Sequence, residues 1–424
     1  MENRWPGFGP TDILLPKDCD LTKWSVVACD QYTSQNEYWQ RVAERVGEAP
    51  SALKVILPES QLEDGHAEEH IAAIGKTMEE YLAADLFRSY PNALIYVERW
   101  LDNQKLRRGL VGAVDLECYD YTPGAGTLVR ATEGTVLSRI PPRVAVRRNA
   151  PLELPHIMML VDDPDQRLIE HLTYETDQME QIYDFDLMER GGHISGYLLT
   201  PELQGDVADL LEDLAAPERF AQQYDAPGKP VLLFAIGDGN HSLASAKATY
   251  EEEKQHTLKE QWAELPSRYA LVELVNLHDE SLEFEPIHRV CFNVDVKKLL
   301  ADLLQTYPGA YYGEGTGHKI TYAWAEGEGK ITIPQPTAQL EVGTLQEFLD
   351  RWLETNTGSV DYVHGADVTR ELGTKDGNIG FLLPAMEKNQ LFKTVIFDGV
   401  LPRKTFSMGE AHDKRFYLEA RKIK

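Results

Sequence analysis

Short apolar runs alternate with segments of helical periodicity along most of this chain. In its first 120 residues, continuous apolar runs predict strands, and apolar residues spaced by three and four predict helices. The expected strands are Trp24–Cys29, Ala93–Arg99 and Arg108–Tyr119, and the expected helices are Glu37–Val46 and Glu68–Phe87. Such mixing of the two patterns indicates an α/β fold.

The middle of the chain carries the clearest strand–helix pair. Leu203–Tyr224 predicts a helix that stops at a segment rich in Pro and Gly. Val231–Ile236 is a wholly apolar strand, and Leu243–Lys254 predicts the next helix. The polar and basic stretch Arg130–Val146 contains two adjacent prolines, and we expect it to be an ordered loop.

The pattern changes near residue 295, where a helix, a Gly-rich segment and a hairpin pattern follow one another. A chain of 424 residues predicts two or three domains at about 150 residues each. We therefore expect an N-terminal core region over residues 1–295 and a smaller C-terminal α/β region over residues 296–424.

Charge and composition narrow the classes of partner. The chain has 42 Lys and Arg against 69 Asp and Glu, a formal net charge of −27. Such a surface repels phosphate backbones and anionic lipids, so we expect no nucleic-acid or membrane partner. The sequence has no apolar run of transmembrane length and no signal-peptide pattern, and its four cysteines form no C-x-x-C pair. These features predict a cytoplasmic protein, in which local cations would have to hold any small anionic ligand.

The strongest signal for a ligand site lies between the apolar strand and the helix in the middle of the chain. It consists of Gly237, Asp238, Gly239, Asn240, His241 and Ser242. Backbone N–H groups at a strand–glycine–helix junction bind anions, and the helix dipole assists them. Asp238 is a candidate base or metal ligand, and His241 a candidate phosphate donor or proton carrier. The alternative is an ordinary turn in which Asn240 or Ser242 caps the helix.

Three other segments combine charged groups with a turn or a strand start. They contain Arg130 with Glu133, His288 with Arg289, and Arg403 with Lys404. Their cations could supply the local positive charge that an anionic ligand needs in so acidic a protein. The alternative for each segment is a solvated turn or surface ion pairing with the excess of acidic residues.

His66 and His70 fit the spacing of an inverted zinc-protease motif. Acidic residues are ordinary in the first turn of a helix, however, and no distal third ligand can be singled out. We therefore expect no metal there. The chain also lacks the glycine-rich loops of Walker ATPases and Rossmann dehydrogenases and the nucleophile elbow of α/β-hydrolases.

Motifs spread nearly end to end resemble those of the bacterial and archaeal family called domain of unknown function 1015. They are Val26–Asp30, Arg107–Glu117, Arg130–Arg143, Asp238–His241, Pro286–Arg289, Asp361–Gly365 and Leu401–Lys404. No activity is established for that family, so the resemblance identifies relatives rather than a function.

The usual Asp-Gly-His-His-Arg motif of that family is similar to a motif of the ParB/sulfiredoxin-like superfamily. That superfamily includes nucleotide-binding partition proteins, ATP-using sulfiredoxins and a free-serine kinase, in which the His-Arg pair holds nucleotide phosphates. In this chain Asp238, Gly239 and His241 match the motif, whereas Asn240 replaces the first His and Ser242 replaces the Arg. The resemblance implies a ParB/sulfiredoxin-like core in the N-terminal region.

Loss of that arginine removes a bidentate phosphate clamp. Either another cation, such as Arg289, Arg403 or Lys404, takes its place, or the nucleotide function is altered or lost. If the site is functional, we expect the C-terminal tail to return to the 237–242 turn with the other basic segments.

Three functional hypotheses follow. The first is phosphoryl transfer from ATP or ADP, with Mg²⁺, to a small metabolite bearing a hydroxyl or carboxyl group. In it the turn holds phosphates, Asp238 or Glu133 holds Mg²⁺ or accepts a proton, and His241, His288, Arg403 and Lys404 balance charge. The second is a non-catalytic sensor of a small anion or nucleotide, and the third is a hydrolase. The sequence names neither the substrate nor the oligomeric state.

Overall fold

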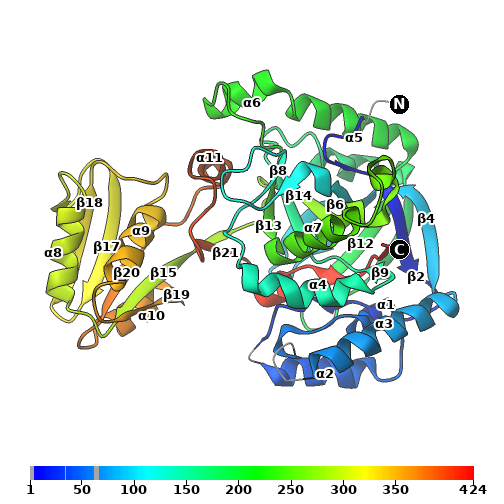
Figure 1. Ribbon diagram of the computed structural model, residues 1–424, viewed down its shortest axis with the longest axis horizontal. Helices are drawn as coiled ribbons and strands as arrows, with labels where there is room; N and C mark the ends of the chain where they lie inside the picture. The colour runs from blue at the N-terminus through cyan, green and yellow to red at the C-terminus, as the bar shows by residue number, and fades with distance from the viewer. Residues whose placement is uncertain (1–3, 34, 62–65) are drawn as a thin grey trace. The chain divides into compact units, whose positions relative to one another are not determined.

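The computed structural model describes residues 4–33, 35–61 and 66–424, which fold as two compact units (Figure 1). Unit 1 consists of Met1–Leu282 with Glu410–Lys424, and unit 2 is Glu283–Gly409. The boundary expected at residue 295 falls within unit 2, after strand β15 (Phe284–Phe292) and before helix α8 (Val296–Thr306). Both units combine sheets with helices, which confirms the α/β class.

Unit 1 is built on a mixed ten-stranded sheet of order β11-β12-β5-β6-β14-β10-β13-β8-β7, with β1 pairing β6 beside that path. Its strands are β1 (Phe8–Gly9), β5 (Ile95–Trp100), β6 (Leu106–Asp115), β7 (Tyr119–Asp120), β8 (Val129–Ala131), β10 (Met158–Val161), β11 (Glu180–Asp186), β12 (His193–Leu198), β13 (Phe234–Asp238) and β14 (Tyr269–Asn276). A separate ribbon pairs β2 (Thr11–Pro16) with β4 (Phe87–Ala93).

Successive side chains of the central strands enter two different cores. Leu271 belongs to one cluster, which also contains residues of the first 80 positions, whereas the adjacent Val272 belongs to the other. The same alternation separates Val111 from Leu110. Because neighbouring side chains of a strand point to opposite faces, the sheet is covered on both sides.

The helices of unit 1 match the sequence expectations in part. They are α1 (Leu21–Trp24), α2 (Asn36–Val46), α3 (Ala67–Ala83), α4 (Ile140–Arg148), α5 (Pro201–Leu214), α6 (Pro217–Tyr224) and α7 (Asn240–Lys254). The single helix expected over Leu203–Tyr224 is two helices, because Pro217 starts a new one. The loop expected over Arg130–Val146 is wrong at both ends, because it includes the end of β8 and most of α4. Pro141 and Pro142 lie in its first turn, where a missing N–H breaks no helical bond.

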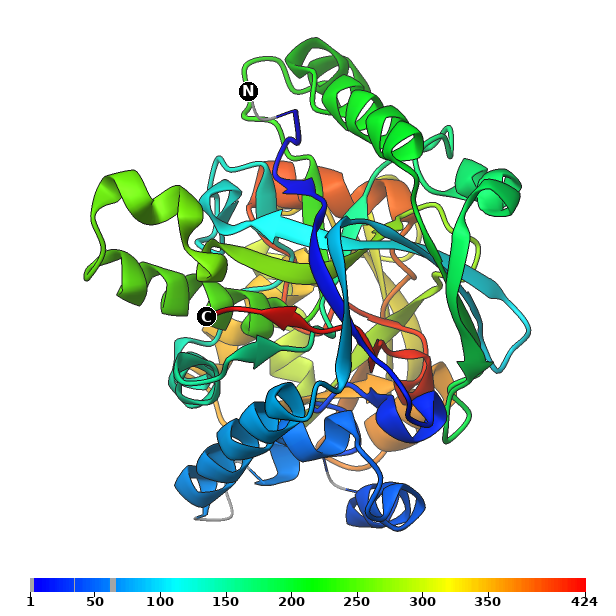
Figure 2. The ribbon, with the colours of Figure 1, turned by 90° about the vertical axis from the view of Figure 1, so that its right-hand side faces the viewer.

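Residues 410–424 return to unit 1 and pair with its early segments. Strand β22 (Phe416–Tyr417) pairs with β3 (Val26–Val27), and β23 (Arg421–Lys422) pairs with β9 (Leu152–Glu153). Figure 2 shows this segment, in red, crossing beside the blue strand β2, to which the Leu14–Ala420 bridge joins it. The segment therefore completes the core of unit 1.

Unit 2 contains a seven-stranded sheet of order β16-β18-β17-β20-β15-β19, with β21 pairing β15. Its further strands are β16 (Tyr311–Tyr312), β17 (His318–Trp324), β18 (Gly327–Ile333), β19 (Ser359–His364), β20 (Ile379–Leu382) and β21 (Phe406–Met408), and its further helices are α9 (Glu341–Leu353), α10 (Ala366–Gly373) and α11 (Lys388–Asp398).

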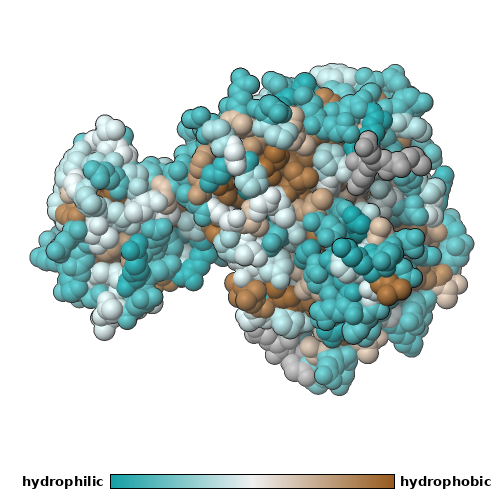
Figure 3. Space-filling model, turned by 45° about the horizontal axis from the view of Figure 1, so that its top comes forward, coloured by the Kyte–Doolittle hydropathy of each residue, from teal (hydrophilic) through white to brown (hydrophobic). Residues whose placement is uncertain are grey.

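Hydrophilic residues predominate on the face of the two units in Figure 3, where hydrophobic areas are separate from one another. This distribution fits the strongly acidic composition. Among the described residues, no helix has both the length and the apolar character needed to cross a membrane.

Candidate functional site

The 237–242 turn has the strand–glycine–helix geometry that its sequence predicts. Strand β13 ends at Asp238, helix α7 starts at Asn240, and Gly239 joins them with φ 81° and ψ 25°. A Cβ atom at Gly239 would lie 3.0 Å from the Ile157 side chain and 3.1 Å from its Cα. Both the left-handed backbone and this close approach call for glycine.

The start of α7 is not capped by a side chain. Leu243 N–H makes the first helical bond, to the Gly239 carbonyl (3.0 Å), so the amides of residues 240–242 precede the intrahelical ladder. Asn240 and Ser242 were the two alternative caps, and neither caps the helix. Instead the Asn240 side-chain oxygen accepts a hydrogen bond from Thr132 N–H (3.2 Å). The strand and the helix are confirmed, and the cap interpretation is wrong.

Asp238 is held at the end of β13 by two donors. Its Oδ1 accepts Gly239 N–H (2.9 Å), and its Oδ2 lies 3.5 Å from Lys414 Nζ. Burial alone would raise the pKa of this carboxyl, but Lys414, His156 and the Gly239 N–H outweigh burial and lower it. Asp238 is therefore an ionised carboxylate at neutral pH, and Lys414 is its counter-charge.

A chain of polar contacts lies at the first turn of α7. Ser242 Oγ is 3.1 Å from His156 Nε2, and His156 Nδ1 is 2.9 Å from the Tyr417 hydroxyl. That hydroxyl also accepts Cys29 N–H (3.2 Å). His156 and Tyr417 are 7% and 3% exposed, so their ring positions are fixed by packing. Ser242 thus contacts an imidazole whose other nitrogen is oriented by a buried phenol.

His241 lies on the other side of the helix start, against the loop that follows β8. Its Nε2 accepts the hydrogen bond of Val136 N–H (3.2 Å), which requires an unprotonated nitrogen. Burial, followed by the charges of Arg143 and Arg139, lowers the pKa of His241. In this arrangement His241 is neutral and orders the loop.

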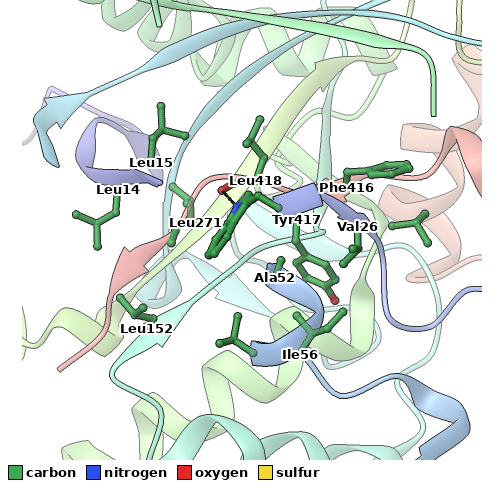
Figure 4. Packing of buried hydrophobic residues seen from close by; sticks show 14 of the residues in the cluster. Leu14, Leu15, Val26, Ala52, Ile56, Leu152, Leu271, Phe416, Tyr417 and Leu418 are labelled. Carbon is green, nitrogen blue, oxygen red and sulfur yellow. Dashed lines mark hydrogen bonds between the residues drawn. The ribbon is translucent and has the colours of Figure 1, made fainter. Parts of the chain in front are cut away.

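A partly enclosed cavity of about 160 Å³ adjoins this first turn. Its polar lining includes Cys29, Glu59, Arg143, Arg147, Glu153, His156, Ser242, Ser245 and Tyr417, and the rest is apolar or backbone. Of the turn, only Ser242 lies in the lining described for this cavity. Figure 4 shows Tyr417 with its ring directed toward Ile56, and both residues line the cavity.

Arg130 reaches the turn by its backbone and not by its guanidinium. Strand β8 pairs in parallel with β13, which places Arg130 opposite Ala235. Its guanidinium donates to the carbonyls of Thr127, Pro230 and Val231, which lie near the beginning of β13, whereas the turn is at its end. The group therefore ties the starts of the two strands together.

Glu133 is half-buried and lies two residues after β8, in the loop that contacts Asn240 and His241. The pairing of β8 with β13 thus brings the Arg130–Glu133 segment to the turn, as the backbone pattern requires.

The other basic segments meet within unit 2. Arg289 is completely buried, and its guanidinium donates to Gln346 Oε1 and to the carbonyls of Ile287, Arg403 and Lys404. The side chains of Arg403 and Lys404 are exposed, and Arg403 pairs with Asp350 at 3.0 Å. Arg289 is thus committed to holding the 403–404 segment against β15.

His288 precedes Arg289 on β15 and is also buried. Its Nδ1 accepts Leu383 N–H (3.1 Å), so it too is a neutral acceptor. Burial, Arg289 and Arg370 lower its pKa.

His66 and His70 lie at the start of α3, the first exposed and the second half-buried. In the parts of the chain that the structure describes, no group of three or more His, Cys, Asp or Glu residues is arranged to hold a metal ion. Residues 62–65, which precede this helix, lie outside the described residues.

Sequence reasoning missed His156, Tyr417 and Lys414. None belongs to a motif, and Tyr417 is 261 positions from its partner His156. The local signal was the basic C-terminal tail. In that tail the sequence pattern singled out Arg403 and Lys404, whereas Lys414 is the cation that contacts Asp238.

A family model described as "Protein of unknown function (DUF1015)" matches residues 13–359. No protein of curated description matches the chain. Among solved structures, a free serine kinase mutant in complex with AMP is similar at 9% identity and a TM-score of 0.39, over 72% of this chain and 90% of that one. A conserved hypothetical protein from Pyrococcus furiosus is similar at 12% identity and a TM-score of 0.35, over 74% of this chain and 94% of that one. Likeness at this level carries no functional argument.

Proposed function

This chain belongs to the DUF1015 family, and we propose that it transfers a phosphoryl group from a nucleotide to a small metabolite. The observation that carries this proposal is the start of α7, where three amides precede the helical ladder behind a left-handed Gly239. A helix start with free amides binds phosphate oxygens through its N–H groups and its dipole. On this proposal the sheet around β13 is a ParB/sulfiredoxin-like core.

Lys414 supports the proposal because it supplies a cation beside the turn. The family's usual arginine is Ser242 in this chain. Lys414 Nζ reaches Asp238 Oδ2 from the returning tail, so it brings a point charge to the end of β13. Phosphoryl transfer depends on such positioning and charge neutralisation more than on covalent catalysis.

In the proposed step the hydroxyl oxygen of the acceptor bonds to the terminal phosphorus, and the bond to the bridging oxygen breaks. The acceptor's proton passes to Asp238, with Glu133 as the other candidate carboxylate, and the nucleotide leaves one phosphate shorter. His241 stays neutral and holds the 132–136 loop over the helix start. Arg403 and Lys404 belong to unit 2, where Arg403 pairs with Asp350.

Mg²⁺ would fit this site between a carboxylate of the turn and the phosphates of the nucleotide. Mg²⁺ in nucleotide enzymes is commonly held by one or two carboxylates and the substrate phosphates. Asp238 provides one such carboxylate, although its oxygens already face Gly239 N–H and Lys414. Bound Mg²⁺ would neutralise phosphate charge; if Asp238 is its protein ligand, Glu133 is the carboxylate that takes the acceptor's proton.

The test combines binding with product detection. Thermal unfolding is measured with AMP, ADP and ATP, each with Mg²⁺; ligand at 100 times its dissociation constant stabilises by about 2.7 kcal/mol. We expect Lys414→Met to weaken nucleotide binding by roughly 1.5–3 kcal/mol, the scale of a charged hydrogen bond. Lys259→Met is the matched control, because it removes an exposed lysine of unit 1 that follows the C-terminal end of α7. Phosphorus NMR with a panel of hydroxyl and carboxyl acceptors detects transfer.

A second candidate is a non-catalytic nucleotide or small-anion sensor. Ser242 favours it, because a serine hydroxyl cannot replace the two parallel hydrogen bonds of an arginine fork. Nucleotide binding without transfer to any acceptor would support the sensor, and absence of nucleotide binding would contradict both candidates.

A further inference from the structure

The cavity beside α7 borders the proposed phosphate site along one wall. Ser242, Ser245 and His156 line that wall. Ser242 is the third residue of α7, so the cavity touches the helix turn whose amides would hold phosphate. A group bound in the cavity would lie next to the transferred phosphoryl group.

The ionic groups in the lining form ion pairs with one another. Arg143 pairs with Glu59 at 2.9 Å, and Arg147 pairs with Glu153 at 2.5 Å, although Arg147 Nε is buried without a hydrogen-bond partner among the described residues. The cavity therefore presents no unpaired charge to a ligand from these four residues. A charged ligand would lose hydration and gain no counter-ion, which disfavours it strongly.

The remainder of the lining is mostly apolar. It includes Val55, Ile56, Leu57, Met78, Val146, Ala150, Leu152, Leu154, Ile157 and Leu271. A polyol or sugar would leave most of its hydroxyls without partners there. At about 160 Å³, the cavity is close to the size of one that holds benzene, about six heavy atoms.

Ser245 Oγ in the lining already donates to the His241 carbonyl, whereas the contact between Ser242 and His156 can admit a ligand hydroxyl. His156 Nε2 and Ser242 Oγ face each other at 3.1 Å, and the Tyr417 hydroxyl fixes the opposite ring nitrogen. A ligand hydroxyl can take the place of either partner in that contact. The site thus matches a molecule with one hydroxyl group and an otherwise apolar body.

We propose that this cavity binds the phosphoryl acceptor, and that the acceptor is a small uncharged alcohol with an apolar body of about six carbon atoms. The inference rests on the proposed function for its catalytic part, whereas the ligand class rests on the cavity alone. The alcohol oxygen takes the place of the imidazole, accepts the hydrogen bond of Ser242 Oγ and lies toward the helix start, which leaves its own proton for Asp238. Its oxygen receives the phosphoryl group, its proton passes to Asp238, and the shortened nucleotide leaves.

The first experiment measures binding without nucleotide. Cyclohexanol and benzyl alcohol are titrated by ligand-observed NMR, with cyclohexanecarboxylate and glycerol as charged and polyhydroxylated comparisons. We expect saturable binding of the two alcohols only. Ala150→Leu fills the cavity from a residue that is 4% exposed, and we expect at least a tenfold loss of alcohol affinity. Ala72→Leu, at an exposed position of α3, is the matched control and leaves affinity unchanged.

Because Ala150→Leu can overpack the core, Val146→Leu at a half-buried lining position is the second filling variant. Equal alcohol binding by both filling variants and the wild type would overturn the cavity assignment. Alcohol binding that the filling variants abolish, with no transfer from any nucleotide, would keep the ligand class and overturn the phosphotransferase. Transfer to glycerol or serine that the filling variants leave intact would keep the phosphotransferase and overturn the alcohol as its acceptor.

Discussion

Each unit buries an arginine almost completely, and the two units stabilise its charge in different ways. In unit 1, Arg415 lies between the carboxylates of Glu273 and Glu419. Burial lowers the pKa of Arg415, but the two carboxylates outweigh burial and raise it. In unit 2, Arg289 donates to one amide oxygen and three backbone carbonyls, and burial lowers its pKa to about 10.

The difference separates two uses of a buried cation. A pair of carboxylates cancels the charge of the arginine, and removing one of them strongly destabilises the fold because part of the buried charge is left uncompensated. Carbonyl oxygens only solvate the charge, but they fix the backbone that carries them. Arg99 in unit 1 is held like Arg289, through the carbonyls of Gly191, His412, Asp413 and Lys414. Such an arginine positions a segment of chain and is unavailable to a ligand.

The largest expected effect comes from Glu273→Gln in unit 1. It leaves Arg415 with one carboxylate and removes the acidic neighbour of Arg107, 3.8 Å away. We expect the free energy of unfolding to fall by about 3–5 kcal/mol, as for other broken buried ion pairs. Urea unfolding followed by circular dichroism measures it. Glu314→Gln, which removes an exposed ion pair with Lys330, is the control and should not measurably change stability. Similar midpoints for the two variants would contradict the charge-cancelling role.

Arg289→Met tests the solvated arginine in unit 2. The substitution leaves three carbonyls and the Gln346 amide oxygen without their donor, and we expect a loss of about 2–3 kcal/mol. Arg403→Met is the matched control, because Arg403 is exposed, pairs with Asp350 and lies over the Tyr362 ring at the surface. Its loss should stay within about 0.5 kcal/mol. Hydrogen exchange of the 403–406 amides would show whether the segment has been released; unchanged protection would contradict the clamp.

Gly239→Ala should destabilise unit 1 by about 1–2 kcal/mol, through its left-handed backbone and the close approach of Ile157. Gly228 also has a left-handed φ, +76°, but a Cβ there meets no atom within 4 Å. Gly228→Ala therefore measures the backbone contribution alone. A smaller loss for Gly239→Ala than for Gly228→Ala would show that the turn relaxes away from Ile157. Thermal unfolding of the two variants makes the comparison.

The smallest expected effect is a change in how stability depends on pH. It concerns His288, which is buried beside Arg289 and would become a second buried cation if it were protonated. The pKa of His288 is lowered in the folded state, so between that value and 6.5 the unfolded chain binds the extra proton. Stability therefore falls as the pH drops below 6.5. We expect His288→Gln to lose less stability than the wild type between pH 7.5 and 5.5, measured as unfolding midpoints. An equal loss of stability in the variant and the wild type would mean that protonation of His288 costs nothing, because Leu383 N–H then finds another acceptor.

His193 provides the opposite sign. It lies between Asp184 and Asp186 at 2.7 Å each, and the hydrogen bond to Asp186 is the main cause of its raised pKa. Its contribution is fully present below pH 6.5 and is lost as the pH rises through the folded value. The wild type therefore loses stability as the pH rises through the folded pKa of His193. We expect His193→Gln to lose less stability than the wild type between pH 6.5 and 8, measured as unfolding midpoints.

The sequence predicted the part of the site that is local in the chain. The apolar run before Gly237 and the Ala-containing segment after Ser242 are enough to predict a strand, a turn and a helix, since each depends on neighbouring residues. The two prolines of the basic stretch Arg130–Val146 favour a loop, but they are compatible with the first turn of α4.

The roles of side chains could not be predicted in the same way. Whether an arginine binds a ligand or its own backbone depends on carbonyls brought near by folding, as for Arg130 and Arg289. His156 meets Ser242 only because β10 lies beside β13 in the sheet. Such pairings follow from strand order, which a local pattern of hydrophobic residues does not specify.

The return of residues 410–424 also has a consequence for biosynthesis. The Trp24 indole donates to the carbonyl of Leu418, 394 positions later, and β3 pairs with β22. At about 5–20 residues per second, a ribosome needs roughly 20–80 s to make the intervening chain. During that time the apolar partners of Trp24 have no closing strand, while all of unit 2 is synthesised. Unit 1 must therefore finish folding after unit 2 has emerged, and a nascent chain stalled before residue 410 would display an unfinished hydrophobic surface to chaperones.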